Sequence, residues 1–254
     1  MRTVTALFTK RTVLGAARYE VAGLLWLAEA GAHGALVVEV VEAKDREQSL
    51  PRLVPAAATP EAAADFGRRL AVTHDAGAES FGAPPEGWSG EGWIGTEPMS
   101  LDHAPTWGAF YAEQRCLPYA RRAYERGGLE ADELAVVEKV CTRIADGLYD
   151  DDAPPARLHG DLWAGNVVVT SEGCVLIDPA AHGGHRITDL AMLSLFGAPY
   201  LDRILSAYET ASTQLPHAWS SLIPLHQLHP LLVHAALFGD PYGSRAAAVA
   251  TRCL

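Results

Sequence analysis

The chain has 254 residues, of which 49% are hydrophobic, and it carries a formal charge of −11 at neutral pH. This length and composition allow a sizeable buried core, in one large domain or in two lobes. The acidic balance argues against a nucleic-acid partner, because a phosphate backbone attracts Lys and Arg. No apolar run approaches the roughly 18 residues that a membrane span needs, so we expect no membrane partner.

The four cysteines are scattered along the chain without a C-x-x-C pair, and the N-terminus lacks the features of a signal peptide. Isolated cysteines are typical of reduced, structural thiols in a cytosolic protein. We therefore expect a cytoplasmic location and no zinc site. The cysteines are Cys116, Cys141, Cys174 and Cys253.

The first 55 residues predict a small α+β unit. Residues 4–10 and 35–41 are typical of strands, residues 13–30 predict a helix closed by Gly31, and residues 49–54 indicate a further extended piece. Prolines at positions 51, 55 and 60 bracket an Ala-rich connector, which favours a lobe boundary there. We expect an N-terminal lobe over residues 1–55 and a C-terminal lobe over residues 56–254.

The second part predicts a mainly helical unit with one embedded β unit. A helix begins near Glu61, and residues 81–98 are Gly-, Pro- and Trp-rich and predict a loop. The other predicted helices cover residues 105–126, 132–148, 189–196, 200–212 and 224–238. The order favours an α+β fold with two unequal lobes over an alternating doubly wound sheet.

The embedded β unit carries the most informative motif. Asp161 and Asn166 are five residues apart, as are the Asp and Asn of the catalytic loop H-R-D-x-x-x-x-N of protein kinases. Two short apolar runs, 167–169 and 174–177, predict a hairpin that returns Asp178 to the side of Asn166. Carboxylate and amide oxygens are suitable Mg²⁺ ligands, and a carboxylate can accept the proton of a hydroxyl. The pattern indicates phosphoryl transfer; an ordinary hairpin with a polar loop is the alternative.

The chain resembles the fructosamine/ketosamine 3-kinase family, within the aminoglycoside-phosphotransferase-like kinases. The resemblance rests on H-G-D-L-W-A-G-N at 159–166, I-D-P-A-A-H-G-G-H-R at 177–186 and D-L-A-M at 189–192. Further support comes from W-I-G at 93–95, F-Y-A-E-Q-R at 110–115 and L-V-H at 232–234. The resemblance implies a two-lobed protein-kinase-like fold and ATP-dependent phosphorylation of a ketoamine, a fructosamine or ribulosamine, at its 3-hydroxyl. The resulting phosphate eliminates, so the family acts in deglycation.

The motif and the resemblance together assign roles to five residues. Asp161 is the expected catalytic base, and Asn166 and Asp178 are the expected magnesium ligands, with ATP as the other cofactor. Lys10 resembles the strand lysine that meets the α- and β-phosphates, and Glu20 resembles the helix glutamate that holds it. For Lys10 and Glu20 the alternative is a pair of solvent-exposed surface charges.

The other predicted positions concern adenine and the acceptor. The segment Arg52, Leu53 and Val54 is the predicted interlobe hinge facing adenine, although an edge strand explains it equally well. Trp163 and Arg115 are candidates for the acceptor pocket, against core packing for Trp163 and pairing with an acidic neighbour for Arg115.

Two further residues are expected to support the catalytic loop. His159 braces it, and Asp189 does so through backbone N–H groups, in keeping with the preference of Asp for helix starts.

The sequence departs from the family pattern in two places. Nine residues precede Lys10 and none is Gly, whereas family members have two strands and a glycine-containing phosphate-covering loop there. In addition, Ile187 follows Arg186 where the family has Glu. Three functions therefore stay open: a ketosamine kinase, a sibling aminoglycoside- or choline-type small-molecule kinase, and a pseudokinase that binds nucleotide or a partner without turnover.

Overall fold

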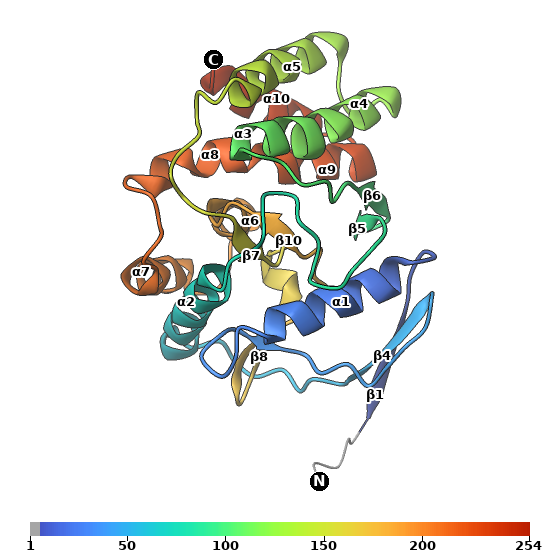
Figure 1. Cartoon of the computed structure of the whole chain (residues 1–254), viewed down its shortest axis with the longest axis vertical. Helices are drawn as coiled ribbons and strands as arrows, with labels where there is room; N and C mark the ends of the chain where they lie inside the picture. Colours follow the sequence, from blue (N-terminus) through green and yellow to red (C-terminus); the bar gives the residue numbers. More distant parts are fainter. Residues whose placement is uncertain (1–5) are drawn as a thin grey trace.

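The N-terminal part of the protein pairs one helix with a small antiparallel sheet (Figure 1). The computed structural model describes residues 6–254. Strand β1 (Leu7–Arg11) pairs with β4 (Glu47–Pro51), and β4 pairs in turn with β3 (Glu42–Ala43). Helix α1 (Ala16–Ala28) buries Leu24 and Leu27. Strand β1 and α1 thus bring Lys10 and Glu20 to the same place.

The centre of the molecule is built from two further sheets. Strand β9 (Gly173–Leu176) forms an antiparallel hairpin with β8 (Val167–Thr170) and also pairs in parallel with β2 (Leu36–Val37). The short strands β7 (Ala156–Leu158) and β10 (His182–Gly184) pair antiparallel beside them. Because β7 ends at Leu158 and β10 begins at His182, this pairing holds the two ends of the segment 159–181 next to each other.

Helices cover the central strands and make up most of the C-terminal part (Figure 1). Their packing produces two large apolar clusters, one around Phe110 and Leu232 and one around Phe66 and Leu190. The helices are α2 (Pro60–Asp75), α3 (Trp107–Phe110), α4 (Leu117–Glu125), α5 (Ala131–Ala145), α6 (Ile187–Phe196), α7 (Leu201–Ala211), α8 (Ile223–His226), α9 (Leu228–Phe238) and α10 (Tyr242–Arg252). None of the helices described in residues 6–254 is long and apolar enough to cross a membrane.

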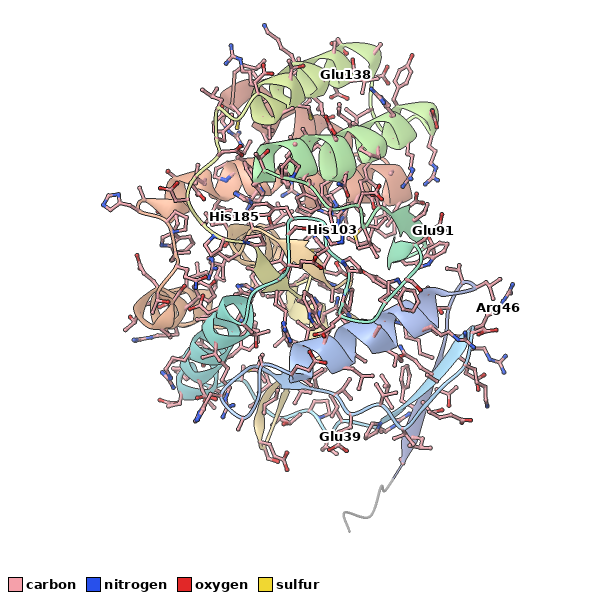
Figure 2. The ribbon with its side chains drawn as sticks, viewed as in Figure 1. Glu39, Arg46, Glu91, His103, Glu138 and His185 are labelled. Carbon is pink, nitrogen blue, oxygen red and sulfur yellow. The ribbon has the colours of Figure 1, made fainter. Side chains whose placement is uncertain are left out.

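Charged side chains lie mainly at the periphery. Figure 2 shows Glu39, Arg46 and Glu138 at the edge of the molecule and His185 in its interior, where only 2% of that residue is exposed. The four cysteines are free thiols, as the sequence predicts. The buried polar residues include His159 and Asn166, which lie next to the central strands.

The structure corrects the predicted strand at 35–41 and the loop at 81–98. Only Leu36–Val37 is a strand, because the chain then passes from one sheet to the other: Val38 N–H donates to Leu176 O, and Val41 N–H to Ser49 O. The predicted loop contains a hairpin of β5 (Gly92–Ile94) and β6 (Glu97–Met99). Its two-residue turn needs the positive φ of 58° that Gly95 adopts.

Two predicted helices are interrupted in the structure. The helix at 105–126 contains a π-helical segment, η1 (Tyr111–Cys116), ahead of Pro118. Pro118 has no N–H, and the carbonyl of Gln114 accepts from the Arg115 guanidinium instead. The helix at 224–238 divides into α8 and α9, and helix α10 was not predicted.

Residues 4 and 5 of the first predicted strand lie outside the described residues, and the lobe boundary at residue 55 stays a prediction.

Candidate active site

The loop between β7 and the β8–β9 hairpin is shaped by a glycine. Gly160 has φ +82°, and a Cβ there would lie 2.1 Å from the carbonyl oxygen of Ala180. Ala180 N–H donates to His159 O at 2.9 Å, so the two segments run in direct contact. Only glycine fits this close approach, which explains the H-G-D order at positions 159–161.

Hydrogen bonds to Asp189 and His159 hold the backbone of this loop in place. The Asp189 carboxylate accepts the N–H groups of His159 at 2.8 Å and of Gly160 at 3.0 Å. His159 donates through Nε2 to Ile177 O at 2.9 Å, while its Nδ1 accepts the N–H of Asp161 at 3.2 Å. Burial lowers the pKa of His159, so its ring is the neutral tautomer that these contacts require. Both residues lie where the sequence analysis placed them.

A second tier of buried groups supports Asp189. His74 Nε2 lies 3.1 Å from Asp189 Oδ2, and its Nδ1 lies 2.8 Å from the hydroxyl of Tyr208. All three side chains are essentially inaccessible to solvent. His74 and Tyr208 were not predicted, because they lie on α2 and α7, far from the motif along the chain.

Asp161, Asn166 and Asp178 converge as the hairpin predicted. Asn166 donates its amide Nδ2 to Asp161 Oδ2 at 3.0 Å and to Asp161 O at 2.8 Å, and it lies 3.5 Å from Asp178 O. Ile177 N–H donates to Asn166 O at 3.1 Å and closes the end of the hairpin. Asp178 adopts φ 54°, an unusual value for a non-glycine residue, and its carboxylate turns toward β1.

Lys10 links the N-terminal sheet to this group. Its Nζ lies 2.9 Å from Glu20 Oε2 and 2.9 Å from Asp178 Oδ1. Glu20 also accepts a hydrogen bond from Gln48 on β4. The alternative of isolated surface charges is excluded, because Glu20 is buried and Lys10 has two acidic partners.

Burial and charge shift the pKa values of this cluster. Burial raises the pKa of Asp161 to about 6, although the hydrogen bond from Asn166 opposes the rise. Burial likewise raises the pKa of Glu20, against the attraction of Lys10. For Lys10, burial lowers the pKa, but the carboxylates of Glu20 and Asp178 outweigh it and the net shift is upward. Such shifts are typical of functional sites.

These groups surround one cavity of about 360 Å³. Its polar wall contains Lys10, Glu20, Asp161, Asn166 and Asp178. The rest of the lining includes aromatic side chains, small residues and Arg11, and among its members that were not assigned to the site from the sequence are Tyr19, Trp93, Gly95 and Thr96. The W-I-G motif at 93–95 was the available signal, since it belongs to the resemblance and lies in the segment predicted as a loop.

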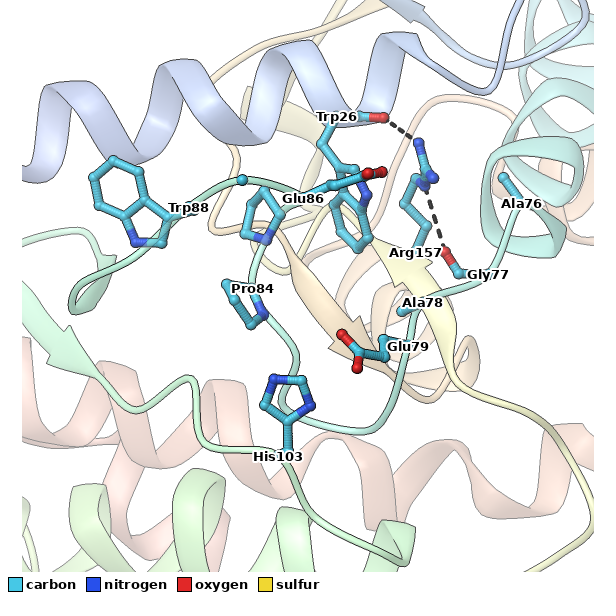
Figure 3. A pocket seen from close by; sticks show the side chains of 12 residues that line it. Trp26, Ala76, Gly77, Ala78, Glu79, Pro84, Glu86, Trp88, His103 and Arg157 are labelled. Carbon is cyan, nitrogen blue, oxygen red and sulfur yellow. Dashed lines mark hydrogen bonds between the residues drawn. The ribbon is translucent and has the colours of Figure 1, made fainter.

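A larger cavity, of about 580 Å³, lies beside α1 (Figure 3). It is lined by Trp26, Trp88, His103 and Arg157, with the Arg157 guanidinium 4.6 Å from the centre of a Trp26 ring. None of the predicted catalytic residues lines it. The smaller cavity is therefore the candidate active site, because the convergent carboxylates and the shifted pKa values are there.

Of the two residues predicted for the acceptor pocket, Trp163 lines the cavity and Arg115 does not. Trp163 lines the active-site cavity and is 43% exposed. Arg115 is 1% exposed, donates to Ser100 O at 2.9 Å and lies over the ring of Phe110. The prediction for Arg115 is wrong because the π-helical segment turns this side chain into the core. The alternative of an acidic partner is also wrong, since none is within reach among the described residues.

The predicted hinge residues do not line the active-site cavity. The N–H of Arg52 donates to Ala6 O at 2.9 Å, which extends the pairing of β1 and β4. Leu53 packs against the apolar cluster around Leu24 and Val38, and Val54 is 78% exposed. The role of the three residues in adenine binding stays a prediction.

Comparison with known proteins agrees with these features. The family model described as fructosamine kinase matches residues 11–254. A crystal structure of a Thermobifida fusca protein assigned as a fructosamine-3-kinase is 47% identical, with a TM-score of 0.89 over 97% of this chain and 85% of that one. A Synechocystis protein named as a probable ketoamine kinase is 33% identical over 74% of this chain. The match spans only 61% of that relative's length.

More distant structures share the fold alone. A choline kinase from Streptococcus pneumoniae is 17% identical, with a TM-score of 0.63 over 97% of this chain and 85% of that one. An ADP-bound aminoglycoside phosphotransferase is 15% identical, with a TM-score of 0.57 over 92% of this chain and 81% of that one. The predicted α+β, kinase-like fold is therefore confirmed.

Proposed function

The chain belongs to the fructosamine kinase family, and we propose that it transfers the γ-phosphoryl group of ATP to a hydroxyl of a ketosamine. The observation that carries this proposal is the convergence of Lys10, Glu20, Asp161, Asn166 and Asp178 on one cavity of about 360 Å³. Phosphoryl transfer depends on positioning and on charge stabilisation, which this set supplies.

In this proposal Asp161 is the base that orients the acceptor hydroxyl and accepts its proton. Its pKa of about 6 leaves the carboxylate mainly ionised at neutral pH while keeping it close to the working pH. Asn166 holds the carboxylate through the 3.0 Å hydrogen bond, and Asp189 and His159 hold the backbone on which it sits. A hydroxyl entering past Trp163 would therefore meet a fixed acceptor.

Asp178 and Asn166 fit the role of magnesium ligands. Among the described residues every hydrogen bond of the Asn166 amide is donated by Nδ2, so Oδ1 is available as a hard oxygen ligand. No group of three or more His, Cys, Asp or Glu within residues 6–254 could hold a metal by itself. This suits a cation that also depends on nucleotide phosphates, whose negative charge Mg²⁺ would offset when bound.

Lys10 would bind the nucleotide phosphates, and Glu20 would position it. The Nζ of Lys10 lies between Glu20 and Asp178, 2.9 Å from a carboxylate oxygen of each, so a phosphate at Lys10 would also lie next to the proposed magnesium ligand. Gln48 holds the other oxygen of Glu20. The net charge of −11 is compatible with ATP, because these local contacts and the metal offset the repulsion.

We assign the 3-hydroxyl of the sugar as the acceptor, in a deglycation reaction. The name of the Thermobifida fusca relative supports the 3-position, and the family's unstable product supports deglycation. The four free cysteines favour a reducing compartment such as the cytoplasm.

The test is acceptor-dependent release of ADP from Mg-ATP. We expect turnover with fructosyl-lysine or ribulosyl-lysine and none with kanamycin or choline. Asp161→Ala should lower kcat by about 10²–10⁴, whereas Asp65→Ala, on the exposed side of α2, should leave it unchanged. Turnover with an aminoglycoside or choline alone would favour a sibling kinase. Nucleotide binding without turnover on any acceptor would favour the pseudokinase.

A further inference from the structure

Five rings form a continuous row that starts at the active-site cavity. Trp163 meets Phe196 edge to face, with ring centres 6.5 Å apart, and Phe196 lies 4.8 Å from His234. His234 in turn lies 5.5 Å from Phe238 and 5.0 Å from Tyr242. We call these five residues the aromatic row. It crosses from the catalytic loop to α6, α9 and α10, segments that are far apart along the chain.

The first ring of the row is fixed within the site. Trp163 lines the cavity two residues after Asp161, and the backbone N–H of Trp163 donates to Asp161 O at 3.2 Å. A Cβ on Gly165 would lie 2.2 Å from the Trp163 ring, so the outer edge of this ring packs directly against the glycine. The row is therefore continuous with the position that an acceptor hydroxyl must reach.

The β5–β6 turn lies beside the same helix as the row. A Cβ on Gly95 would lie 3.7 Å from Leu237 on α9, and Figure 1 shows this hairpin next to α9. Gly95 and Thr96 line the cavity from that turn. The turn and Trp163, the first ring of the row, thus both bound the cavity.

The two ends of the cavity differ in chemistry. Lys10, Glu20 and Asp178 form the ionic end, which the phosphates and the metal would occupy. An acceptor with its hydroxyl at Asp161 must extend away from that end. The remaining wall has Trp93 and Trp163 among its members, together with the segment 11–13 that follows Lys10. The rest of the acceptor therefore points toward the aromatic row.

The row is accessible and carries no formal charge. Trp163 is 43% exposed and Phe238 is 65% exposed. Burial lowers the pKa of His234, so its ring is neutral at neutral pH. Large exposed aromatic groups beside a site are typical of a binding surface for apolar groups. The protonated amine of a ketosamine would suit the face of Trp163, because indole rings attract cations.

We propose that the aromatic row binds the amine-derived part of the ketosamine and selects an alkyl or arylalkyl group there over a methyl group or an anionic one. This inference rests on the proposed function and names the acceptor class of the same site. A long hydrocarbon substituent would cover Trp163 and Phe196 and reach toward Phe238.

The test compares acceptors that differ only in the amine. We expect kcat/KM for fructosyl-dodecylamine to exceed that for fructosyl-methylamine by about tenfold or more, through KM, since each buried methylene favours binding. Phe238→Ser should lower the dodecylamine-to-methylamine ratio about fivefold. Phe238 is 65% exposed, so this change should leave the fold intact. Tyr124→Ser, an exposed ring on α4, is the matched control and should leave the ratio unchanged.

Each outcome has one meaning. Equal kcat/KM values for the two acceptors, or a ratio insensitive to Phe238→Ser, would overturn the aromatic-row inference and leave the proposed function standing. A lower ratio in Tyr124→Ser as well would also overturn it, since the effect would not belong to the row. No turnover with any ketosamine would overturn the proposed function and this inference together.

Discussion

The loop that carries Asp161 and the strand that carries Lys10 meet at one cavity but are held in different ways. The loop is tied by buried hydrogen bonds to Asp189, His159 and Asn166. Most of β1 is exposed, and Lys10 depends on two ion pairs that are partly open to solvent. The comparison indicates that the proposed acceptor side is preorganised by the fold, whereas the proposed nucleotide side is held by charges that a ligand can rearrange.

The difference has an energetic basis. A buried acceptor such as the Asp189 carboxylate cannot exchange its partners for water, so each lost hydrogen bond leaves an unsatisfied group. Partly exposed ion pairs contribute little to stability because water and salt screen them. Changes in the loop should therefore reduce both stability and catalysis, and changes at Lys10 should mainly reduce nucleotide binding.

Gly160→Ala should have the largest effect. The new Cβ would lie 2.1 Å from Ala180 O at a φ of +82°, so the loop must shift. We expect a loss of about 2–5 kcal/mol of unfolding free energy and a fall in kcat of at least ~10². Thermal melts and ADP release measure both. Gly197→Ala is the control, because it also has a positive φ but no atom within 4 Å, and it should cost only about 1 kcal/mol. Equal effects would contradict the preorganised loop.

Asp189→Asn should have the second largest effect. The amide keeps the shape but can no longer accept from both His159 and Gly160, so one buried N–H loses its partner. We expect about 1–3 kcal/mol of destabilisation and a kcat lower by about tenfold, with KM for ATP little changed. Asp202→Asn, on the exposed surface of α7, is the control. Destabilisation without any change in kcat would remove the loop-positioning role.

Lys10→Met should act on nucleotide binding. Loss of a charge-assisted contact of about 1.5–3 kcal/mol should raise KM for ATP by ~10–100-fold. Titration of KM against ATP, with the acceptor saturating, gives the value. Arg18→Met, which breaks the exposed pair with Asp45, should change KM little. An unchanged KM in Lys10→Met would show that the nucleotide phosphates lie elsewhere.

The pH dependence should separate activity from stability at Asp161. Its pKa is raised by burial from 3.8 to about 6, so kcat/KM should fall as the pH drops through about 6 and the base becomes protonated. The free energy of unfolding changes in the opposite direction. The raised folded-state pKa stabilises the folded protein most below about pH 3.8, and this contribution is lost as the pH rises through about 6. Asp161→Asn should remove this part of the pH dependence of melting. The same profile in wild type and variant would contradict the shift.

The sequence predicted those parts of the site that depend on local pattern. The β8–β9 hairpin follows from two short apolar runs and a Gly-containing turn, and it alone brings Asn166 to Asp178. The position of Asp161 follows from its spacing to Asn166. Lys10 and Glu20 were placed by resemblance and order, and their ion pair agrees with that placement.

The missed parts depend on contacts between distant segments. Arg115 lies in a π-helical turn whose direction is set by Pro118 and by the surrounding core, and no residue pattern reveals that its guanidinium points inward. His74 and Tyr208 support Asp189 from two other helices. The residues 35–41 have strong β-propensity, yet they divide between two sheets because their partners come from β9 and β4.

The most direct test of the central claim follows the phosphoryl group itself. Phosphorus NMR of the protein with Mg-ATP and fructosyl-lysine should show loss of the γ-phosphate signal and a new phosphomonoester on carbon 3 of the sugar. Asp161→Asn, with an unchanged melting temperature at neutral pH or a higher one, should slow this transfer by about 10²–10⁴. Transfer at the wild-type rate in Asp161→Asn, or release of free phosphate from ATP at the same rate with and without fructosyl-lysine, would contradict the account.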